Sequence, residues 1–363
     1  PWNAVFNPNN ETNQRIQRNY EEVITYYGLF GQLEYSKDAV SAFFQGAISN
    51  QDHIATNEYN YAESTDSDKV SNLGFNLKAG AAYEINQIHK VFANAGYYSR
   101  QPFHDNLYND LRSSIDLITP EIENENITGF EAGYQFKSEI ISANLNLYHT
   151  TWDNRTINSN NGENSESPSF EGYQTQGVKQ VHMGVELEVF TRPFDNLKLN
   201  GFLSMGDWQF NGDATQRTFD GNGILQGTQD INIDGYKVGG AAQVTGGING
   251  VYTILPRLSI DGAWNWYNDQ HSEGSLEKAP LSMPSYDTVD AGFSYKMLLG
   301  KEKLNSLQFR VNVNNLFDEV YLESVSGNTQ ATSTSVNYKG VNTSNNGRFG
   351  YGRTWNVSMR YNF

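Results

Sequence analysis

Apolar residues recur at every second position over most of the chain, and this period constrains the fold more than any other feature. From Leu73 to Ile85, one set of alternate positions is apolar and the set between them is polar or small. The same split recurs from Ile141, from Val181 and from Leu307, and again over residues 354–363. Side chains of a β-strand point alternately to opposite faces, so these segments are strands with one apolar and one polar face. The pattern predicts an all-β chain.

The strands are joined by connections whose lengths alternate strictly between short and long. We expect thirteen strands, at residues 22–36, 39–53, 71–85, 90–100, 126–136, 140–152, 178–191, 197–208, 237–254, 258–268, 286–297, 304–315 and 352–363. The long connections are 54–70, 101–125, 153–177, 209–236, 269–285 and 316–351. Tight turns at one rim and long loops at the other are typical of transmembrane antiparallel up-and-down β-barrels of bacterial outer membranes.

Composition excludes several other classes. The 363 residues carry 25 Lys and Arg against 41 Asp and Glu, and a net charge of −16 excludes nucleic acid as a partner. With 22 Tyr and 20 Phe the chain is too aromatic for bulk disorder, and without cysteine it has no thiol nucleophile or disulfide. A soluble β-sandwich or propeller is the competing fold, but sandwich strands are usually about 5–6 residues long, whereas several segments here alternate for a dozen residues or more.

Three segments resemble one known family. The run Val313-Asn-Asn-Leu-Phe-Asp-Glu-Val-Tyr321, followed by a long loop and a last alternating strand ending in Phe363, resembles the C-terminal end of TonB-dependent outer-membrane receptors. The segments Phe92–Pro102 and Ile127–Tyr134 resemble inner strands of the same family. The resemblance covers essentially the whole chain, and the abundance of Asn, Tyr and Gly is similar to that of receptors from the Bacteroidetes lineage.

The resemblance implies a barrel of about 22 strands around an N-terminal plug. Residues 1–363 would then supply about thirteen C-terminal strands of the barrel domain, with the plug outside this chain. The implied function is energised import of a scarce nutrient (an iron chelate, cobalamin, an oligosaccharide or a peptide) across the outer membrane of a Gram-negative bacterium. The implied partners are the TonB complex acting through the plug, the barrel-assembly machinery, outer-membrane lipid, and a surface lipoprotein or other complex subunits. No enzyme activity and no cofactor are implied.

Two alternatives from other functional classes stay open. The first is a passive porin-like or fatty-acid-type channel of about 14 strands. The second is a surface barrel that does not transport and serves in adhesion or complex assembly. A plug domain upstream, or dependence of uptake on TonB, separates energised import from both.

Catalytic and metal sites find little support. The six histidines show no metal-ligand spacing, and Asp52-His53 and His104-Asp105 are expected to be solvated rim residues rather than a catalytic dyad, because neighbours in a strand point to opposite faces. Asp220 and Asn222 are similar to part of a calcium loop, but the spaced acidic ligands and the closing Glu are missing. We therefore expect no metal and a turn-rich loop there.

Charged residues on the polar parity are expected to face the lumen. A cation on the lipid face costs about 2–4 kcal/mol near the membrane midplane. These residues are Lys78, Glu84, Glu131, Glu186, Glu188, Arg310 and Arg360. Their expected role is to solvate the lumen and to hydrogen-bond to the plug; direct contact with substrate is the alternative.

A second set on the same parity lies where strands reach the rim with the long loops. It comprises Tyr98, Arg100, Trp152, Trp208 and Tyr267. Aromatic faces beside a guanidinium offer stacking area and a charge for an anionic group, so we expect this set to bind ligand. The alternative is that these side chains only pack against loops that fold inwards. Trp264 and Trp266 fall on the other parity and are expected to anchor the barrel in lipid.

The C-terminal aromatics generate a prediction about assembly. Tyr361 and Phe363 occupy the apolar parity, and a terminal aromatic there resembles the tail read by the barrel-assembly machinery; the alternative is that both are interfacial aromatics. Deleting Phe363 should lower the amount of folded protein in the membrane, measured by heat-modifiable mobility on gels. Unchanged amounts would leave only the interfacial role.

Overall fold

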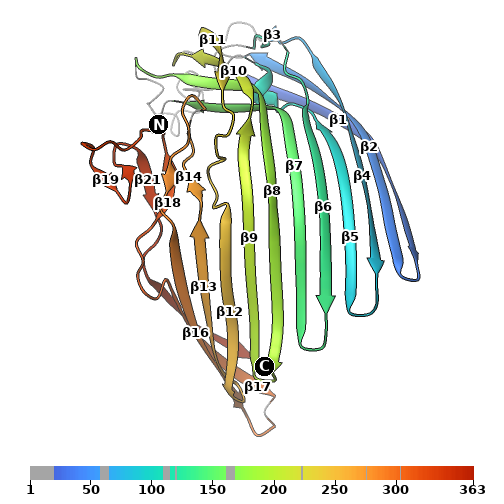
Figure 1. Cartoon of the computed structure of the whole chain (residues 1–363), viewed down its shortest axis with the longest axis vertical. Coiled ribbons are helices and arrows are strands. Elements are labelled where there is room, and N and C mark those ends of the chain that lie inside the picture. Colours follow the sequence, from blue (N-terminus) through green and yellow to red (C-terminus); the bar gives the residue numbers. More distant parts are fainter. Residues whose placement is uncertain are drawn as a thin grey trace, which may run out of the picture.

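The body of the protein is one curved antiparallel sheet whose long strands follow each other in chain order (Figure 1). The computed structural model describes residues 20–57, 65–108, 115–118, 121–160, 168–221, 224–274, 276–302 and 304–363. The thirteen strands of the main path are β1 (Tyr20–Lys37), β2 (Val40–Asn57), β4 (Val70–Glu84), β5 (His89–Arg100), β6 (Glu125–Lys137), β7 (Ile141–Asn160), β8 (Gly172–Phe194), β9 (Leu197–Asn211), β12 (Val244–Leu255), β13 (Leu258–Asn268), β16 (Tyr286–Leu299), β17 (Asn305–Asn314) and β22 (Thr354–Asn362). All thirteen expected strands are therefore confirmed.

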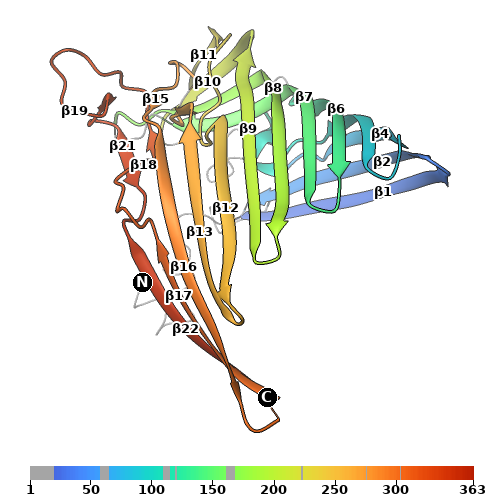
Figure 2. The ribbon, with the colours of Figure 1, turned by 60° about the horizontal axis from the view of Figure 1, so that its bottom comes forward.

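Small elements gather at the end of the sheet opposite the short turns (Figures 1 and 2). They are β3 (Thr65–Asp66), the 3-10 helix η1 (His104–Leu107), β10 (Asp213–Phe219), β11 (Leu225–Asn232), β14 (Gln270–His271), β15 (Ser282–Met283), β18 (Leu322–Ser326), β19 (Asn337–Tyr338), β20 (Val341–Asn342) and β21 (Asn346–Phe349). This end carries every long connection, so the predicted asymmetry between the two rims is present. β1 and β22 end the strand order, and no pairing joins them in the described part of the chain.

The structure differs from the sequence prediction mainly at the loop end. β7 continues to Asn160 and β8 begins at Gly172, so much of the expected loop 153–177 is strand. Within 209–236, β10 and β11 form a hairpin that pairs with β8. The expected strand 237–254 begins only at Val244. Beyond the hydrocarbon layer a strand needs no lipid-facing apolar row, so the alternation that predicts strands fades there while backbone pairing continues.

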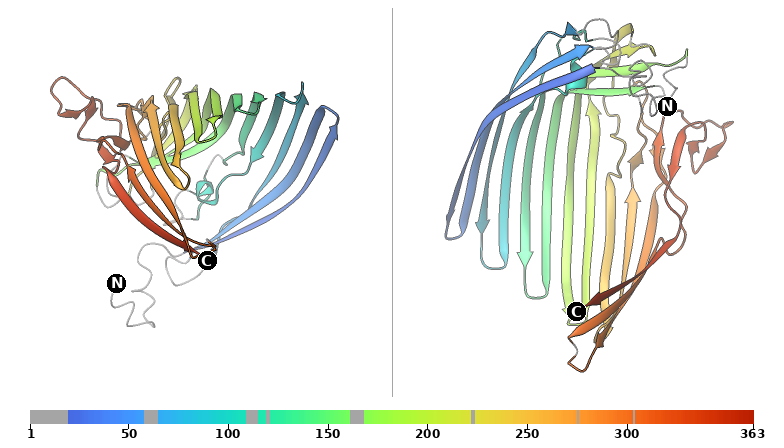
Figure 3. Two further views of the ribbon diagram at one scale, coloured as in Figure 1. Left: turned by 90° about the horizontal axis from the view of Figure 1, so that it is seen from below. Right: turned by 180° about the vertical axis from the view of Figure 1, so that it is seen from behind.

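Register assigns the residues to faces, because directly opposed residues of an antiparallel pair share a face. Lys78 lies opposite Gly96, Glu131 opposite Tyr148, and Glu186 opposite Ser204. Ser204 lies opposite Thr245, and Thr245 lies opposite Tyr267, so the same face continues across β12 and β13. It reaches Arg310 on β17 and Arg360 on β22. We call it the inner face, because η1 lies within the curve of the sheet and packs against that side of β2 (Figure 3).

The opposite, outer face is strongly apolar and open to solvent in the isolated chain. Leu77 is 47% exposed, Leu147 48% and Val357 59%. Removing one such side chain from water gains roughly 1.5–3 kcal/mol, so rows of them across thirteen strands require an apolar surrounding. Trp264 lies on this face, as does Tyr361, whose ring centroid is 6.0 Å from that of Phe363. The face suits lipid, while the assembly role of Tyr361 and Phe363 stays a prediction.

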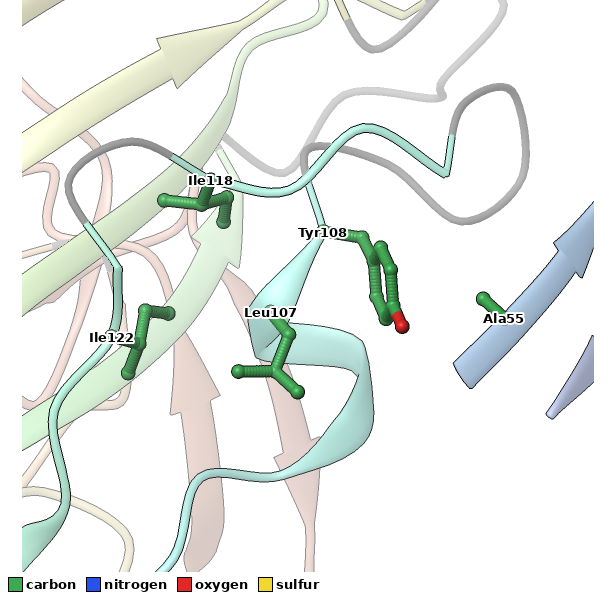
Figure 4. Close-up of a cluster of buried hydrophobic side chains, with 5 residues drawn as sticks. All are labelled: Ala55, Leu107, Tyr108, Ile118 and Ile122. Carbon is green, nitrogen blue, oxygen red and sulfur yellow. The ribbon is translucent and has the colours of Figure 1, made fainter. Parts of the chain in front are cut away.

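Buried apolar clusters lie among the loops rather than along the sheet. One joins Ala55 of β2 to residues around η1 (Figure 4), a second surrounds Val178 and Ile233, and a third surrounds Met283 and Leu322. The described parts of these connections are thus folded onto the end of the wall. Within the described ranges, no helix is long and apolar enough to cross a membrane.

The two rims predict opposite labelling from outside the cell. A cysteine at Ser333, exposed between β18 and β19, should react with a membrane-impermeant maleimide on intact cells. A cysteine at Asp195, exposed in the turn between β8 and β9, should react only after the outer membrane is opened. Because the chain has no cysteine, the unmodified protein is the blank. Labelling at Asp195 alone on intact cells would reverse the topology.

Candidate functional site

Aromatic and charged side chains meet on the inner face where β5 to β9 approach the loop end. The central contact is a sandwich in which the His182 ring lies between two indoles. Its centroid is 4.6 Å from that of Trp152, edge to face, and 5.1 Å from that of Trp208, in a stack at 14°. The register explains the contact, since His182 lies opposite Thr150 on one side and Trp208 on the other.

Hydrogen bonds fix the orientation of Trp208. Its indole Nε1–H donates to the hydroxyl of Tyr148 at 2.8 Å. Its backbone N–H donates to Gln243 Oε1 at 2.8 Å, and Gln243 Nε2 donates back to the Trp208 carbonyl at 2.8 Å. Gln243 is 1% exposed, so a fully buried amide ties the segment before β12 to this tryptophan. Trp208 is therefore held in place on the inner face and stays partly exposed.

A β-bulge in β7 brings a guanidinium onto the inner face. The register between β7 and β8 shifts between Trp152 and Arg155, and Asn154 adopts φ of 60°, a conformation that Asn tolerates better than most residues. The extra residue reverses the alternation, so Arg155 joins the face of Trp152. Its Nε lies 3.4 Å from Glu125 Oε1, and its Nη1 contacts Gln180 Oε1.

Glu125 lies between two arginines. Arg100 Nη1 is 3.8 Å from Glu125 Oε2, and the Arg100 guanidinium also lies 4.2 Å from the Phe103 ring centroid. Gln180 Nε2 lies 2.9 Å from His182 Nε2, which links these charges to the tryptophans. Two guanidiniums share one carboxylate, so the group carries a net positive charge on a strongly acidic chain. We call this set the mouth network: Arg100, Glu125, Tyr148, Trp152, Arg155, Gln180, His182 and Trp208.

Three of the five predicted ligand-binding residues belong to the mouth network, and two lie elsewhere. Tyr267 stacks on Tyr286 at 4.8 Å, and Tyr286 stacks on Tyr321 at 4.0 Å, forming a second aromatic group. Tyr98 folds back over Gly96, where an added Cβ would meet its ring at 2.8 Å. The predicted set is therefore divided, and its binding role stays a prediction.

Sequence reasoning missed several residues of these groups. His182 and Tyr286 are on the expected inner parity, but their contacts depend on the register between strands, which one sequence does not specify. Arg155 was hidden by the bulge, and Tyr321 lies in a long connection where no periodicity applies. The signal for Arg155 was Asn154 just before it, because Asn tolerates the positive φ that this bulge requires.

The charged residues predicted to face the lumen all lie on the inner face, and several have partners within the wall. Asp261 accepts a two-pronged hydrogen bond from Arg310 at 2.8 and 2.9 Å. Glu131 accepts from Asn94 at 2.8 Å, and Asn146 donates to Glu186 at 3.4 Å. Lys78 lies 6.0 Å from the centroid of Phe43. Glu84, Glu188 and Arg360 share the face, opposite Lys90, Asn144 and Gln308.

The two histidine–aspartate pairs give one correction. Asp52 and His53 point to opposite faces, as neighbours in a strand must. The expectation that the histidines are solvated rim residues is wrong, because His53 is 0% and His104 5% exposed. They contact each other, since the fold brings η1 onto β2 and excludes water from both rings.

Metal ligands are sparse in the part of the chain that the structure describes. No three His, Asp or Glu side chains there are grouped as a metal site. Of the weak calcium candidates, Asn222 lies outside the described residues. The Asp220 carboxylate accepts from the backbone N–H of Ile224 and from Gln226 Nε2, both at 3.0 Å, which is the bonding of a turn.

A polar cleft of about 860 Å³ lies among the loops at the same end of the sheet. It is lined by the end of β7, by Glu171 and Tyr173, by Glu273, Gly274, Glu277 and Lys278, and by asparagines near β18 and β21. Three carboxylates, from Glu171, Glu273 and Glu277, face one lysine, Lys278. The cleft therefore repels anions, in contrast to the mouth network.

Comparison with known proteins identifies the family. The sequence model described as TonB dependent receptor-like, beta-barrel matches residues 2–316. A search of curated proteins returns no match.

Solved structures share the fold at low sequence identity. The copper transporter OprC gives a TM-score of 0.65 at 14% identity, covering 94% of this chain and 48% of that one. The ferric citrate transporter FecA, in its unliganded form, gives 0.66 at 13%, covering 95% and 45%. The ferric yersiniabactin uptake receptor FyuA from Yersinia pestis gives 0.64 at 14%, covering 95% and 46%.

The present chain thus spans about half the length of each of these solved structures. The match of the family model over most of the sequence, together with the thirteen-strand wall, has one conclusion: the chain belongs to the TonB-dependent receptor-like β-barrel family.

Proposed function

We propose that this chain forms wall and mouth of a receptor that imports a scarce nutrient across the outer membrane of a Gram-negative bacterium, driven by TonB. The observation that carries the proposal is the division of the sheet into two faces. One face is apolar enough to need lipid, and the other carries the ion pairs and the mouth network. We propose that import is coupled to TonB because the chain belongs to this family.

The mouth network is where we propose that the ligand binds. Partly exposed indoles provide stacking surface, and the uncompensated guanidinium charge attracts an anionic or carbonyl-rich group. The inner face would hydrogen-bond to a plug through residues such as Glu131 and Lys78. Iron chelates, cobalamin, oligosaccharides and peptides remain open as substrate.

The proposal also includes the partners of the receptor in the outer membrane. Barrel-assembly machinery would read the C-terminal strand, TonB would act through the plug of the full receptor, and a surface lipoprotein would cover the loop end where one is present. The acidic cleft near Glu273 offers amine- and hydroxyl-binding groups beside the mouth.

Energised import predicts that uptake depends on TonB. Cells that lack the full-length receptor should deplete one nutrient from a defined medium more slowly than the parent strain, as followed by mass spectrometry of the medium. Loss of TonB should slow depletion of the same nutrient to the same extent. If depletion of the nutrient depends on the barrel and does not depend on TonB, the barrel would instead be a passive channel.

The two-faced wall predicts which tryptophans matter for binding. Replacing Trp152 and Trp208 together with Ala should weaken binding of the nutrient roughly 5- to 150-fold, since each aromatic contact is worth about 0.5–1.5 kcal/mol. His182→Ala should weaken it as well, because the ring between the two indoles is lost. Affinity is measured by calorimetry on the purified receptor.

Trp266→Ala is the matched control for these variants. Trp266 lies opposite Gly246 and Asp287 on the outer face, away from the mouth network. Its loss should leave affinity unchanged while the barrel still folds. An affinity that depends on Trp266 and not on Trp152 or Trp208 would refute the assignment of faces and the site with it.

A further inference from the structure

The connection between β5 and β6 folds over the inner face of β2 at the mouth. Gln101 Nε2 donates to Ser49 Oγ at 2.9 Å, and the Ile118 N–H donates to the Leu107 carbonyl at 2.9 Å. Leu107, Tyr108 and Ile118 pack with Ala55 in a buried cluster (Figure 4). The segment is therefore docked on the wall by a small apolar core and a few polar contacts.

A histidine pair lies beside this cluster. Nδ1 of His53 on β2 is 3.0 Å from Nδ1 of His104 on η1, with ring centroids 5.2 Å apart. An imidazole–imidazole hydrogen bond needs one N–H donor and one bare nitrogen acceptor, so the observed contact requires at least one neutral ring. Both Nε2 atoms are buried, and no described residue forms a hydrogen bond with either of them.

The pair lies level with a polar stretch on the outer face of β2. On the outer face of β2, the apolar run ends at Ile48, and the next outward side chains are Asn50 and Asp52. Asp52 forms an ion pair with Lys69 at 2.7 Å, which belongs in water or among head groups. His53 follows Asp52 directly, so it shares that level and can exchange protons with the medium once uncovered.

From this geometry we infer that His53 and His104 form an acid-sensitive latch, which holds the segment of residues 101–108 closed over the mouth and releases it at low pH. The first added proton goes to the bare Nε2 of the donor ring, and the hydrogen bond between the two Nδ1 atoms is kept. A second would place two N–H groups head to head at 3.0 Å and bury two charges, so the closed arrangement would be lost.

Nearby acidic groups favour the charged form of the histidines, but they do not outweigh the effect of burial, which favours the neutral form. The charged and titratable groups near the pair are Glu22 on β1, Asp52 on the opposite face of β2, and Asp105 and Tyr108 next to His104. Burial lowers the pKa of His104 despite the charge of Asp105. Burial and the neighbouring His104 lower the pKa of His53, although Asp52 and Glu22 act to raise it.

The sign of the pH dependence follows from these shifts. Both pKa values are lowered in the closed form, so closure is fully stabilised above the ordinary histidine value of about 6.5 and weakens as pH falls below it. Opening takes up as many as two protons. Each fall of one pH unit therefore raises the equilibrium constant for opening by up to about 100-fold. The proposal goes beyond import itself: acid in the medium would widen the mouth.

The test uses the full-length receptor in lipid nanodiscs, with spin labels on cysteines that replace Phe103 and Thr151. Phe103 is exposed in the docked segment, and Thr151 belongs to the β7 wall. At about pH 7.5 the label distance should be narrowly distributed, and at about pH 4.5 a second, longer and broader population should dominate. An unchanged distribution at the lower pH would overturn the latch.

Variants of the pair complete the test. In His53→Asn with His104→Asn, amides replace the facing nitrogens and do not titrate, so the closed distance should persist at both pH values. In His104→Asn alone, one titrating ring is left, so the opening equilibrium constant should change by at most about tenfold per pH unit. His89→Asn, at the far rim, should respond like the unmodified receptor. A double variant that still opens in acid would assign the response to other groups.

The two histidines could instead bind a metal ion, and the test must distinguish this from the latch. The described residues place no third His, Asp or Glu with the pair, so zinc or a chelator at about pH 7.5 should leave the label distance unchanged. A distance that shifts with zinc and returns with chelator would make the pair a metal site and overturn the latch.

Discussion

The constraint on which the structure depends is that every backbone N–H and C=O inside a membrane must be paired within the protein. Antiparallel strands in unbroken chain order meet it, and their pairing fixes which residues lie opposite one another. A register that holds from β1 to β22 keeps Lys78, Tyr148, Ser204 and Arg310 on one face. The apolar exterior follows from that alignment, and so does the mouth network apart from Arg155, which a bulge in β7 brings onto the inner face.

The same constraint explains what the sequence could predict. Within the lipid-spanning length, each strand must alternate apolar and polar residues, so all thirteen strands and the two faces were visible in the sequence. Beyond the lipid the requirement ends: the extensions of β7 and β8 and the β10–β11 hairpin were missed. Arg155 was missed because a bulge at Asn154 reverses the alternation, and His53 with His104 because only the tertiary fold joins them.

The loop end combines two kinds of chemistry with different consequences. Trp152, His182 and Trp208 are held by rings and amides that make the site rigid, a property that lowers the entropic cost of binding. The docked segment around His104 rests on a small cluster and a titratable contact. We propose that the docked segment is a pH-dependent cover and that the held aromatic side chains form a rigid ligand site.

The central claim is that one face of the wall meets lipid and the other meets the lumen. It is tested most directly by spin labels at successive positions from Val181 to Leu187 of β8 in the full-length receptor in bilayers. We expect accessibility to oxygen to peak at odd positions and accessibility to a water-soluble nickel chelate at even ones, because side chains alternate between faces. The opposite phase, or no period of two, would contradict the account.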